Sequence, residues 1–148
     1  MAFFINCLAH AAEKPVLLLT GFEPFGPYKT NASWETVKEF QGREIAGCTI
    51  QTARLPVVYD EMAAPLQEAI EKHKPQAVIC FGVGTADIRI ETLARNGYNP
   101  SKPRDNKDKE PPRAEIVPGA EAAIPTGLPS DVIMNTLKEA KIGASKSS

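Results

Sequence analysis

The chain has 148 residues, with 17 lysines and arginines against 18 aspartates and glutamates, a net charge of -1 and 43% hydrophobic residues. This is the composition of a globular domain, and a chain of this length buries enough apolar surface to need no disulfide or metal. The near-neutral charge, with scattered basic residues, argues against a nucleic-acid-binding protein, and no apolar run approaches the roughly 20 residues of a membrane span.

The first residues form a short apolar run that ends in Ala9-His10-Ala11, a pattern that signal peptidase cleaves. No lysine or arginine precedes this run. Two interpretations of residues 1–14 therefore stay open. They form either a partial signal peptide, which implies export, or an N-terminal extension with no role in export. Residues 15–148 are expected to form a single α/β domain.

Strand-like and helix-like segments alternate after residue 14, which predicts the class of this fold. We expect an α/β fold in three layers, with an open, twisted, mainly parallel sheet and helices on both faces. Residues 16–20 are a continuous apolar run that ends at Gly21, as in a strand buried on both faces.

The next two elements have clear signals at their ends. A helix is expected to begin after Asn31 or Ser33, either of which can cap it, and to end at Gly42. Residues 48–58 are rich in β-branched side chains and predict a second strand, with Pro56 near its end.

A second helix is expected over residues 60–73, with Asp60 as its cap. Its predicted apolar stripe consists of Met62, Leu66, Ala69 and Ile70. Residues 77–82 predict a third buried strand that ends in a glycine turn, and residues 87–93 predict an extended segment.

Residues 95–118 hold five prolines among charged and polar residues, so they cannot belong to the core. A last helix is expected over residues 131–141, capped by Ser130, with Ile133, Leu137 and Ala140 turned inward. No strand is expected after Gly143.

The cysteines and histidines give no sign of a metal site. Cys7, Cys48 and Cys80 are widely spaced with no C-x-x-C motif, and Cys48 and Cys80 look like core residues. His10 and His73 have no ligand-type residue at a suitable spacing. We expect neither a metal nor a cofactor.

The segment Gly21-Phe22-Glu23-Pro24-Phe25-Gly26 lies where the first strand leads into the first helix, the edge at which open α/β sheets bind ligands. Two aromatic rings are unusual in a turn, because exposed aromatic surface is unfavourable unless something covers it. Either the rings fill the core, or Phe22 and Phe25 form an apolar slot for a flat ring.

Two further features follow the third strand. Gly82-Val83-Gly84-Thr85 lacks the complete motif of a phosphate-binding loop, so we interpret it as a simple turn. Glu91 is a lone carboxylate in a segment flanked by apolar residues, Ile88-Arg89-Ile90-Glu91-Thr92-Leu93. It either pairs with Arg89 or Arg95, or orients a catalytic imidazole.

These residues resemble a known family. Residues 20–26, followed by residues 31–35, are similar to the opening signature of the type I pyroglutamyl peptidases, also called pyrrolidone-carboxylate peptidases. The resemblance covers nearly all of residues 16–145. Further matching segments are Leu55-Pro56-Val57, residues 87–96, Ile116-Val117-Pro118-Gly119-Ala120 and Thr126-Gly127-Leu128-Pro129.

The resemblance implies an α/β cysteine peptidase that removes N-terminal pyroglutamate from peptides, with a cysteine nucleophile, a histidine base and a glutamate that orients the histidine. Glu91 aligns with that glutamate. Phe22 and Phe25 align with the residues that form the apolar walls of the substrate pocket. Such walls suit pyroglutamate, because its lactam is neutral.

This chain also departs from the family pattern. The family's nucleophile follows shortly after the segment that resembles Gly143-Ala144-Ser145, and its base lies further on; neither has a counterpart here. Cys80 and His73 match neither position. Measured against the family that the chain resembles, the C-terminal part of the fold is therefore expected to be incomplete. Val83 takes the place of a polar pocket residue, and the arginine of Pro103-Arg104-Asp105-Asn106 is displaced.

Three hypotheses follow for function. The chain is a truncated or degenerate family member without activity, a non-catalytic binding module for pyroglutamyl or similar amide ligands, or a gene fragment. The resemblance implies N-terminal pyroglutamyl peptides as partners and a cytoplasmic location, unless residues 1–11 are a partial signal peptide. Neither nucleic acids nor membranes are expected partners. Self-association into a homo-oligomer is also expected, because missing core elements would leave a sheet edge exposed.

Overall fold

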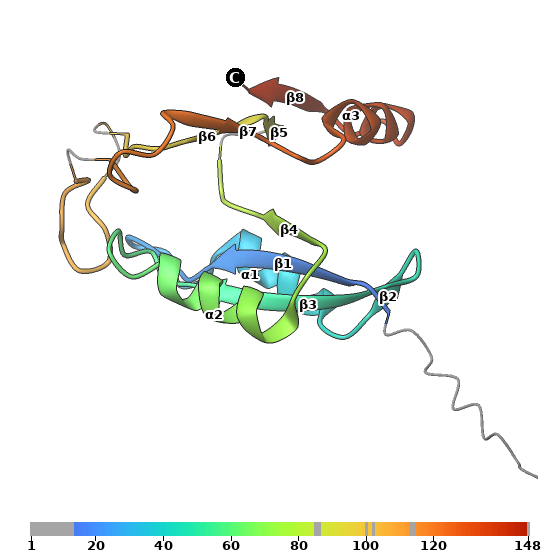
Figure 1. Ribbon diagram of the computed structural model, residues 1–148, viewed down its shortest axis with the longest axis horizontal. Helices are drawn as coiled ribbons and strands as arrows, with labels where there is room; N and C mark the ends of the chain where they lie inside the picture. The colour runs from blue at the N-terminus through green and yellow to red at the C-terminus, as the bar shows by residue number, and fades with distance from the viewer. Residues whose placement is uncertain (1–13, 85–86, 100, 102, 113–114, 148) are drawn as a thin grey trace, which may run out of the picture.

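The computed structural model describes residues 14–84, 87–99, 101, 103–112 and 115–147. Of the predicted N-terminal segment, residues 1–14, all but Lys14 lie outside the described residues. The described elements form two groups (Figure 1). The first group, up to residue 80, holds a four-stranded sheet and two helices. The second group, from residue 88 on, holds two two-stranded sheets and one helix.

The first group is built around one central strand. Strand β1 (Val16–Phe22) pairs in parallel with β3 (Cys48–Leu55) on one side and with β4 (Ala77–Cys80) on the other. Strand β2 (Glu44–Ile45) pairs with β3 in antiparallel orientation, so the order is β2-β3-β1-β4. The apolar run of β1 suits this central place, because a strand in the middle of a parallel sheet is covered on both faces.

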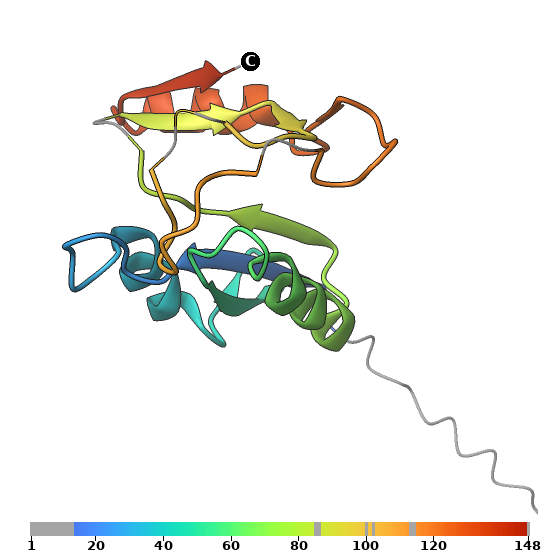
Figure 2. The ribbon, with the colours of Figure 1, turned by 90° about the vertical axis from the view of Figure 1, so that its left-hand side faces the viewer.

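The helices of the first group cover opposite faces of this sheet. Helix α1 (Ala32–Val37) continues into a 3-10 turn, η1 (Lys38–Phe40), and α2 (Ala63–His73) connects β3 to β4. The two crossovers run in opposite directions across the sheet, so their right-handed connections place the two helices on opposite faces. Figure 2 shows one helix on each side of the sheet. This confirms the predicted α/β fold with a mainly parallel sheet.

The buried apolar core lies in the first group. In the described part of the chain, the buried hydrophobic residues are Leu18, Leu19, Val37, Ile50, Leu55 and Val58. Helix α1 packs very closely on β1: a Cβ atom added at Gly21 would lie only 2.7 Å from the backbone of Trp34. Glycine at this position is what permits the contact.

The second group is packed more loosely. Strand β5 (Ile88–Glu91) pairs in parallel with β8 (Ala144–Ser147), and β6 (Leu93–Arg95) pairs with β7 (Ala123–Pro125) in antiparallel orientation. Helix α3 (Ser130–Glu139) precedes β8 and has no buried residue. The side chains of these five elements are half-buried or exposed.

Strand β8 corrects the prediction that no strand follows Gly143. Its sequence, Ala-Ser-Lys-Ser, contains no β-branched residue, so strand propensity gave no signal. Pairing with β5 supplies the main-chain hydrogen bonds instead. Beyond the strands, the backbone N–H and the hydroxyl of Thr92 both donate to the carbonyl of Ser147, at 3.1 and 2.6 Å.

Two of the predicted helix caps are also wrong. Helix α2 begins at Ala63 and not at Asp60, because the N–H groups of Glu61 and Met62 close a turn onto the carbonyl of Val58 before the helix. The carboxylate of Asp60 binds Lys109 at 2.8 Å. Ser130 is the first residue of α3, and the capping position belongs to Pro129. The inward positions expected for Ile70 and Ala140 are exposed.

The prediction of a buried third strand is wrong as well. Strand β4 is an edge strand with one described neighbour, β1, and its side chains are half-buried or exposed. Cys80 is exposed and Cys48 half-buried, so neither is the core residue that the apolar surroundings indicated. The first strand reaches Phe22, and the second ends at Leu55, before Pro56.

Candidate functional site

The turn after β1 holds the two phenylalanines that the sequence singled out. Both Phe22 and Phe25 are half-buried. One ring carbon of Phe22 lies 3.9 Å from where a Cβ atom of Gly82 would be, so this ring stands beside the end of β4. The ring of Phe25 meets Tyr28 edge to face, with centroids 5.9 Å apart. Part of each phenylalanine therefore stays accessible.

Two buried polar side chains fix the backbone of this turn. The N–H of Phe22 donates to Oγ of Ser33 at 3.0 Å, and Nδ2 of Asn31 donates to the carbonyl of Glu23 at 2.9 Å. Asn31 and Ser33 are also bonded to each other, and Oδ1 of Asn31 accepts from the N–H of Ser33. Asn31 is thus the helix cap that the sequence predicted as one of two alternatives. The same side chain holds the helix and the turn.

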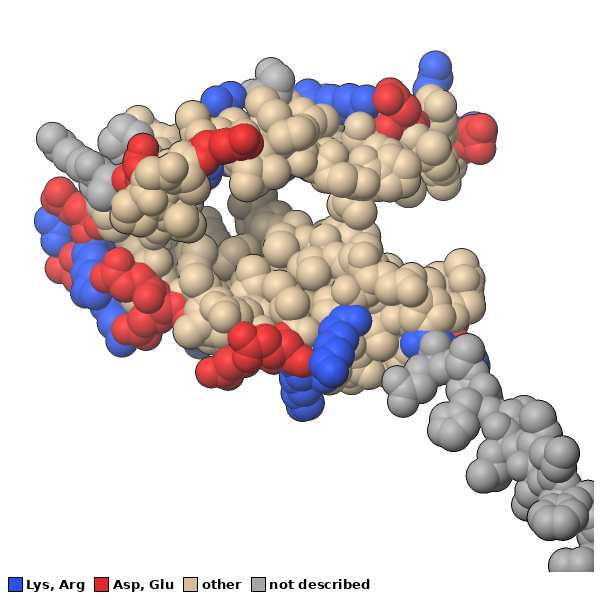
Figure 3. Space-filling view, viewed as in Figure 1, with Lys and Arg blue, Asp and Glu red and all other residues tan. Residues whose placement is uncertain are grey.

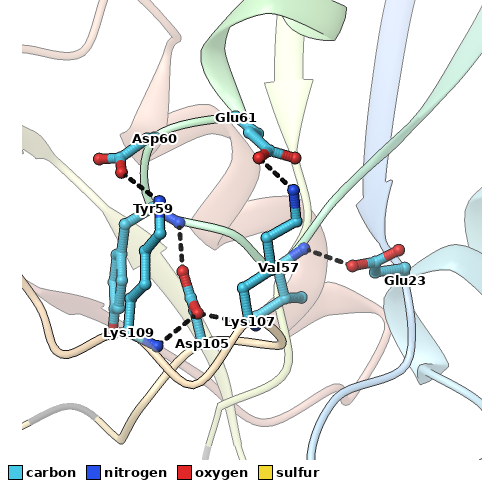
Figure 4. Close-up of polar contacts among 8 residues, drawn as sticks. All are labelled: Glu23, Val57, Tyr59, Asp60, Glu61, Asp105, Lys107 and Lys109. Carbon is cyan, nitrogen blue, oxygen red and sulfur yellow. Dashed lines mark hydrogen bonds and ion pairs between the residues drawn. The ribbon is translucent and has the colours of Figure 1, made fainter.

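Glu23 connects the turn to the proline-rich segment. Its Oε1 accepts from the N–H of Val57 at 3.0 Å and from Nδ2 of Asn106 at 2.9 Å. Asn106 also donates from Nδ2 to the carbonyl of Pro24 at 2.8 Å, and its own N–H donates to the carbonyl of Val57. We call Glu23, Val57 and Asn106 the Glu23 network; Figure 4 shows its contact between Glu23 and Val57.

Asp105 organises the neighbouring loop (Figure 4). Its carboxylate accepts from the N–H groups of Lys107 and Lys109, at 2.8 and 2.9 Å, and from that of Tyr59 at 3.1 Å. The hydroxyl of Tyr59 donates to the carbonyl of Pro103 at 2.7 Å. Asp105 is only 8% exposed, which corrects the expectation that residues 95–118 contribute nothing to the buried interior.

The surroundings of Asp105 favour the ionised form of its carboxylate. Burial by itself raises the pKa of Asp105, but the N–H groups of Lys109, Tyr59 and Lys107 and the charge of Lys109 outweigh it and lower that pKa. The pKa of Tyr59 is raised, first by burial and then by the charge of Asp105. The pKa of Lys109 is raised chiefly by its hydrogen bond to Asp60.

Arg104, the displaced arginine of this segment, is turned to nearby carboxylates. Its guanidinium pairs with Glu110 at 2.8 Å and with Asp108 at 3.3 Å. The charge of Arg104 is therefore paired with carboxylates of its own loop.

Glu91 lies in the second group, as the last residue of β5, and its side chain is exposed. In the register of the parallel pair it stands opposite Ser147, near the end of β8. Glu91 and the two phenylalanines thus belong to different groups of elements. Phe22 and Glu91 each end a strand, and Phe25 follows one.

No metal centre competes with these residues for the role of functional site. The described residues hold no cluster of three or more His, Cys, Asp or Glu side chains that could bind a metal. An open depression of about 400 Å³ lies between α3 and the start of β8, away from Phe22 and Phe25 in the chain and without Glu91 in its lining. None of the helices in the described ranges has the length and apolar character to cross a bilayer.

The roles of Glu23, Asp105 and Asn106 cannot be predicted from the sequence alone. In the sequence, Glu23 is only one residue of the aromatic turn. Its partner Asn106 lies 83 positions away, so no local spacing could connect them. The one local signal is the Asp-Asn pair two residues after Pro103, a composition typical of a structured turn.

Comparison with known proteins identifies relatives of this chain. The family model described as pyroglutamyl peptidase matches residues 15–148. The pyrrolidone-carboxylate peptidase of Gloeobacter violaceus is 42% identical over 130 residues, which cover 86% of this chain and 63% of the relative. That of Bacillus licheniformis is 42% identical over 133 residues, covering 88% of this chain and 61% of the relative.

Solved structures show the same likeness in three dimensions. The crystal structure of pyroglutamyl peptidase I from Bacillus amyloliquefaciens superposes with a TM-score of 0.85 at 35% identity, covering 90% of this chain and 66% of that one. A mutant (E192D) pyrrolidone carboxyl peptidase from Pyrococcus furiosus gives 0.86 at 34% identity, covering 90% and 64%. The chain thus spans less than two thirds of the length of these relatives. The chain belongs to the pyroglutamyl peptidase family.

Proposed function

We propose that this chain carries the part of a pyroglutamyl peptidase that recognises N-terminal pyroglutamyl peptides, with Phe22 and Phe25 as the apolar walls of the site. Glu91 is the residue that orients a catalytic imidazole. The observation that carries the proposal is the fixed aromatic turn at the end of the central strand of a family member.

The turn suits a neutral lactam. Pyroglutamate offers a flat ring with one carbonyl and one N–H, so a site for it needs apolar surface and a few hydrogen-bonding groups. Phe22 and Phe25 supply half-buried rings, and hydrogen bonds from Phe22 and to Glu23 fix the backbone between them. A turn held this firmly loses little conformational entropy when a ligand binds.

Glu91 suits a positioning role in cysteine-peptidase chemistry. In that reaction the imidazole accepts the thiol proton, the thiolate attacks the carbonyl carbon, and the imidazolium protonates the leaving amine. A carboxylate beside the imidazole stabilises the imidazolium. Glu91 is exposed at the end of β5, with Ser147 opposite it.

Hydrolysis is not expected from these 148 residues alone. Cys48 lies at the start of β3 and Cys80 at the end of β4, and neither is hydrogen-bonded to His73 in the described part of the chain. Losing the nucleophile of a catalytic unit removes on the order of a million-fold in rate in a well-studied protease. The proposal is therefore binding without turnover.

Titration calorimetry with pyroglutamate and a pyroglutamyl dipeptide tests the binding step. We expect millimolar or tighter binding that Phe22→Ala and Phe25→Ala each weaken at least tenfold. The matched control Ile45→Ala, on the edge strand β2 two strands away from β1, should bind as the unchanged chain does. Absence of heat and of any shift in melting temperature would overturn the proposal.

A fluorogenic pyroglutamyl amide tests the absence of turnover. The polypeptide, purified free of host peptidase, is expected to release no fluorophore above the rate of the buffer blank. Release at a rate that Cys80→Ala abolishes would identify Cys80 as a nucleophile and contradict this part of the proposal.

A further inference from the structure

Asn96 and Gly97 form an Asn-Gly pair directly after β6. In such a pair the main-chain nitrogen of the glycine can attack the side-chain amide carbon of the asparagine, because glycine has no Cβ atom that hinders the approach. The attack forms a cyclic succinimide and releases ammonia. Water then opens the ring to aspartate or isoaspartate. The pair is therefore a chemically reactive point in the chain.

The attacking nitrogen belongs to an accessible residue. Gly97 is exposed, and its N–H makes no hydrogen bond in the described part of the chain. A hydrogen bond from this N–H would have to break before the nitrogen could attack. The main chain at Gly97 therefore places no barrier of this kind in the way of the reaction.

The side chain of Asn96, in contrast, is bound to residues 115–120, which we call the 115–120 loop. Its Oδ1 accepts from the N–H of Val117 at 2.8 Å, and its Nδ2 donates to the carbonyl of Val117 at 2.8 Å. Nδ2 also lies 3.4 Å from the carbonyl of Ala120. Because both ends of the side-chain amide are paired with this loop, its carbon cannot turn toward the nitrogen of Gly97.

The 115–120 loop is itself weakly held. All of its residues are exposed, Val117 by 56%. Apart from those with Asn96, its hydrogen bonds within the described ranges are internal. The N–H of Ala120 donates to the carbonyl of Val117 at 3.1 Å, and the N–H of Gly119 donates to the carboxylate of Glu115 at 2.7 Å. A segment with so few buried contacts opens at a low cost in free energy.

We propose that Asn96 is a site of spontaneous deamidation that the 115–120 loop controls, protected while the loop is closed and reactive when it opens. The bond that forms joins the nitrogen of Gly97 to the amide carbon of Asn96. The bond that breaks joins that carbon to Nδ2, which takes up the proton of the Gly97 N–H and leaves as ammonia. Water is the only other reactant. The proposal does not depend on pyroglutamyl binding.

The product weakens the contact with the loop. A carboxylate has no hydrogen to donate, so at position 96 it faces the carbonyls of Val117 and Ala120 without a donor. Acidic and basic side chains are intermingled on the face that Figure 3 shows, so one added charge has no large charged patch there to act on. Its effect is therefore expected to be local, and each completed reaction leaves the loop more open than before.

Peptide mass spectrometry during incubation at mildly alkaline pH measures the rate, and an isoaspartyl methyltransferase assay identifies the product. A free peptide of residues 91–102 supplies the rate without the loop. We expect Asn96 to react between tenfold and a thousandfold more slowly in the folded chain than in this peptide, because only the open loop permits the reaction.

Gly97→Ala tests the chemistry. Nothing lies within 4 Å of the added Cβ atom, so the variant is expected to fold as the unchanged chain does. The methyl group hinders the attack, and we expect deamidation to slow at least fivefold in the chain and in the peptide alike.

Glu115→Ala tests the control by the loop. It removes the acceptor of the Gly119 N–H and is expected to speed deamidation of the folded chain at least threefold. Glu121→Ala is the matched control, since this exposed side chain has no hydrogen bond or ion pair with the residues that the structure describes, and it should leave the rate unchanged. Circular dichroism checks that both variants fold.

Asn96→Asp reproduces the product directly. Hydrogen exchange at the amides of Val117 and Ala120 is expected to become at least fivefold faster. Asn99→Asp adds the same charge nearby, but its Oδ1 only accepts, from the N–H of Ser101 at 2.9 Å, and aspartate keeps that contact. This control should leave exchange in the 115–120 loop unchanged.

Several results would overturn the proposal. These are a folded chain that reacts as fast as the peptide or more than a thousandfold more slowly, equal rates for Glu115→Ala and Glu121→Ala, or a Gly97→Ala chain that reacts as the unchanged one does. Unchanged exchange in Asn96→Asp would contradict the effect assigned to the product. If Glu115→Ala does not fold, the comparison of the chain with the peptide decides.

Discussion

The side-chain amide of Asn106 donates a hydrogen bond of 2.9 Å to the carboxylate of Glu23, across 83 positions of the chain. The same amide reaches the carbonyl of Pro24 at 2.8 Å. These bonds fasten the proline-rich segment directly to the turn that carries Phe22 and Phe25. The segment is therefore a support of the candidate site and not a free connection.

Glu23→Ala is expected to release this segment. The half-buried N–H of Val57 loses its acceptor and the exposed amide of Asn106 keeps only the carbonyl of Pro24, at a cost of about 2 kcal/mol in the free energy of unfolding. Trypsin cleavage after Lys107 and Lys109 should become at least tenfold faster. Glu23→Gln keeps an oxygen acceptor and should restore most of the protection, whereas equal cleavage of all three proteins would show that Glu23 does not hold the segment.

Gly21→Ala is expected to destabilise the fold by about 3 kcal/mol, because the added Cβ would lie 2.7 Å from the backbone of Trp34 and force α1 away from β1. Gly84→Ala is the control, since nothing lies within 4 Å of its added Cβ. Urea unfolding measures both variants. A Gly21→Ala protein as stable as the control would contradict the close packing of α1.

Asp105 should make stability depend on pH in acid. Its pKa in the folded protein is lowered from an ordinary value of about 3.9, so its ionised form stabilises the fold above that pH. This contribution is lost as the pH falls through the lowered pKa. Asp105→Asn, which does not ionise, should be less stable than the unchanged chain at pH 7, and the difference should shrink below about pH 4.

Asp108→Asn provides the comparison for this pH series. It removes the same charge from the same loop, but its side chain is 84% exposed. Urea unfolding between pH 7 and pH 3 should show little change in its stability relative to the unchanged chain. If the stability of both variants relative to the unchanged chain depended on pH in the same way, the cause would be the loss of one negative charge and not the hydrogen bonds of Asp105.

Thr20→Val is expected to leave stability unchanged or to raise it by up to about 1 kcal/mol. The hydroxyl of Thr20 is buried and has no hydrogen-bond partner among the described residues, so valine of similar shape removes an uncompensated polar group. Ser33→Ala should do the opposite, because its hydroxyl is bonded to Phe22 and Asn31. A clear loss of stability in Thr20→Val, measured by thermal unfolding, would reveal a partner for this hydroxyl.

The sequence predicts those elements that are determined by residues close together in the chain. The apolar run of β1 and the cap at Asn31 depend on neighbours a few residues away, and both predictions are confirmed in substance. Strand β8 depends on β5, more than fifty residues earlier, and its own residues carry no strand signal. The carboxylate of Asp60, predicted as a cap, likewise binds Lys109, 49 positions away.

The candidate site likewise has one part that local sequence predicts and another part that forms only on folding. The position of Phe22 at the end of a strand follows from the sequence around it, and the structure places it there. The carboxylate of Glu23 and the amide of Asn106 meet only after folding. The roles of Phe22, Phe25 and Glu91 toward a ligand stay predictions until binding is measured.

The in-register pairing of Glu91 with Ser147 fixes where the backbone leaves β8. Four residue pairs share this register, so the exit cannot slide along β5 without breaking all of them. One residue inserted before β8 would be absorbed by the connection to α3. One residue inserted within β8 would advance the exit by about 3.3 Å and turn the following side chains to the other face. The register of the strand pair therefore sets the position at which the backbone leaves β8 relative to the backbone of Glu91.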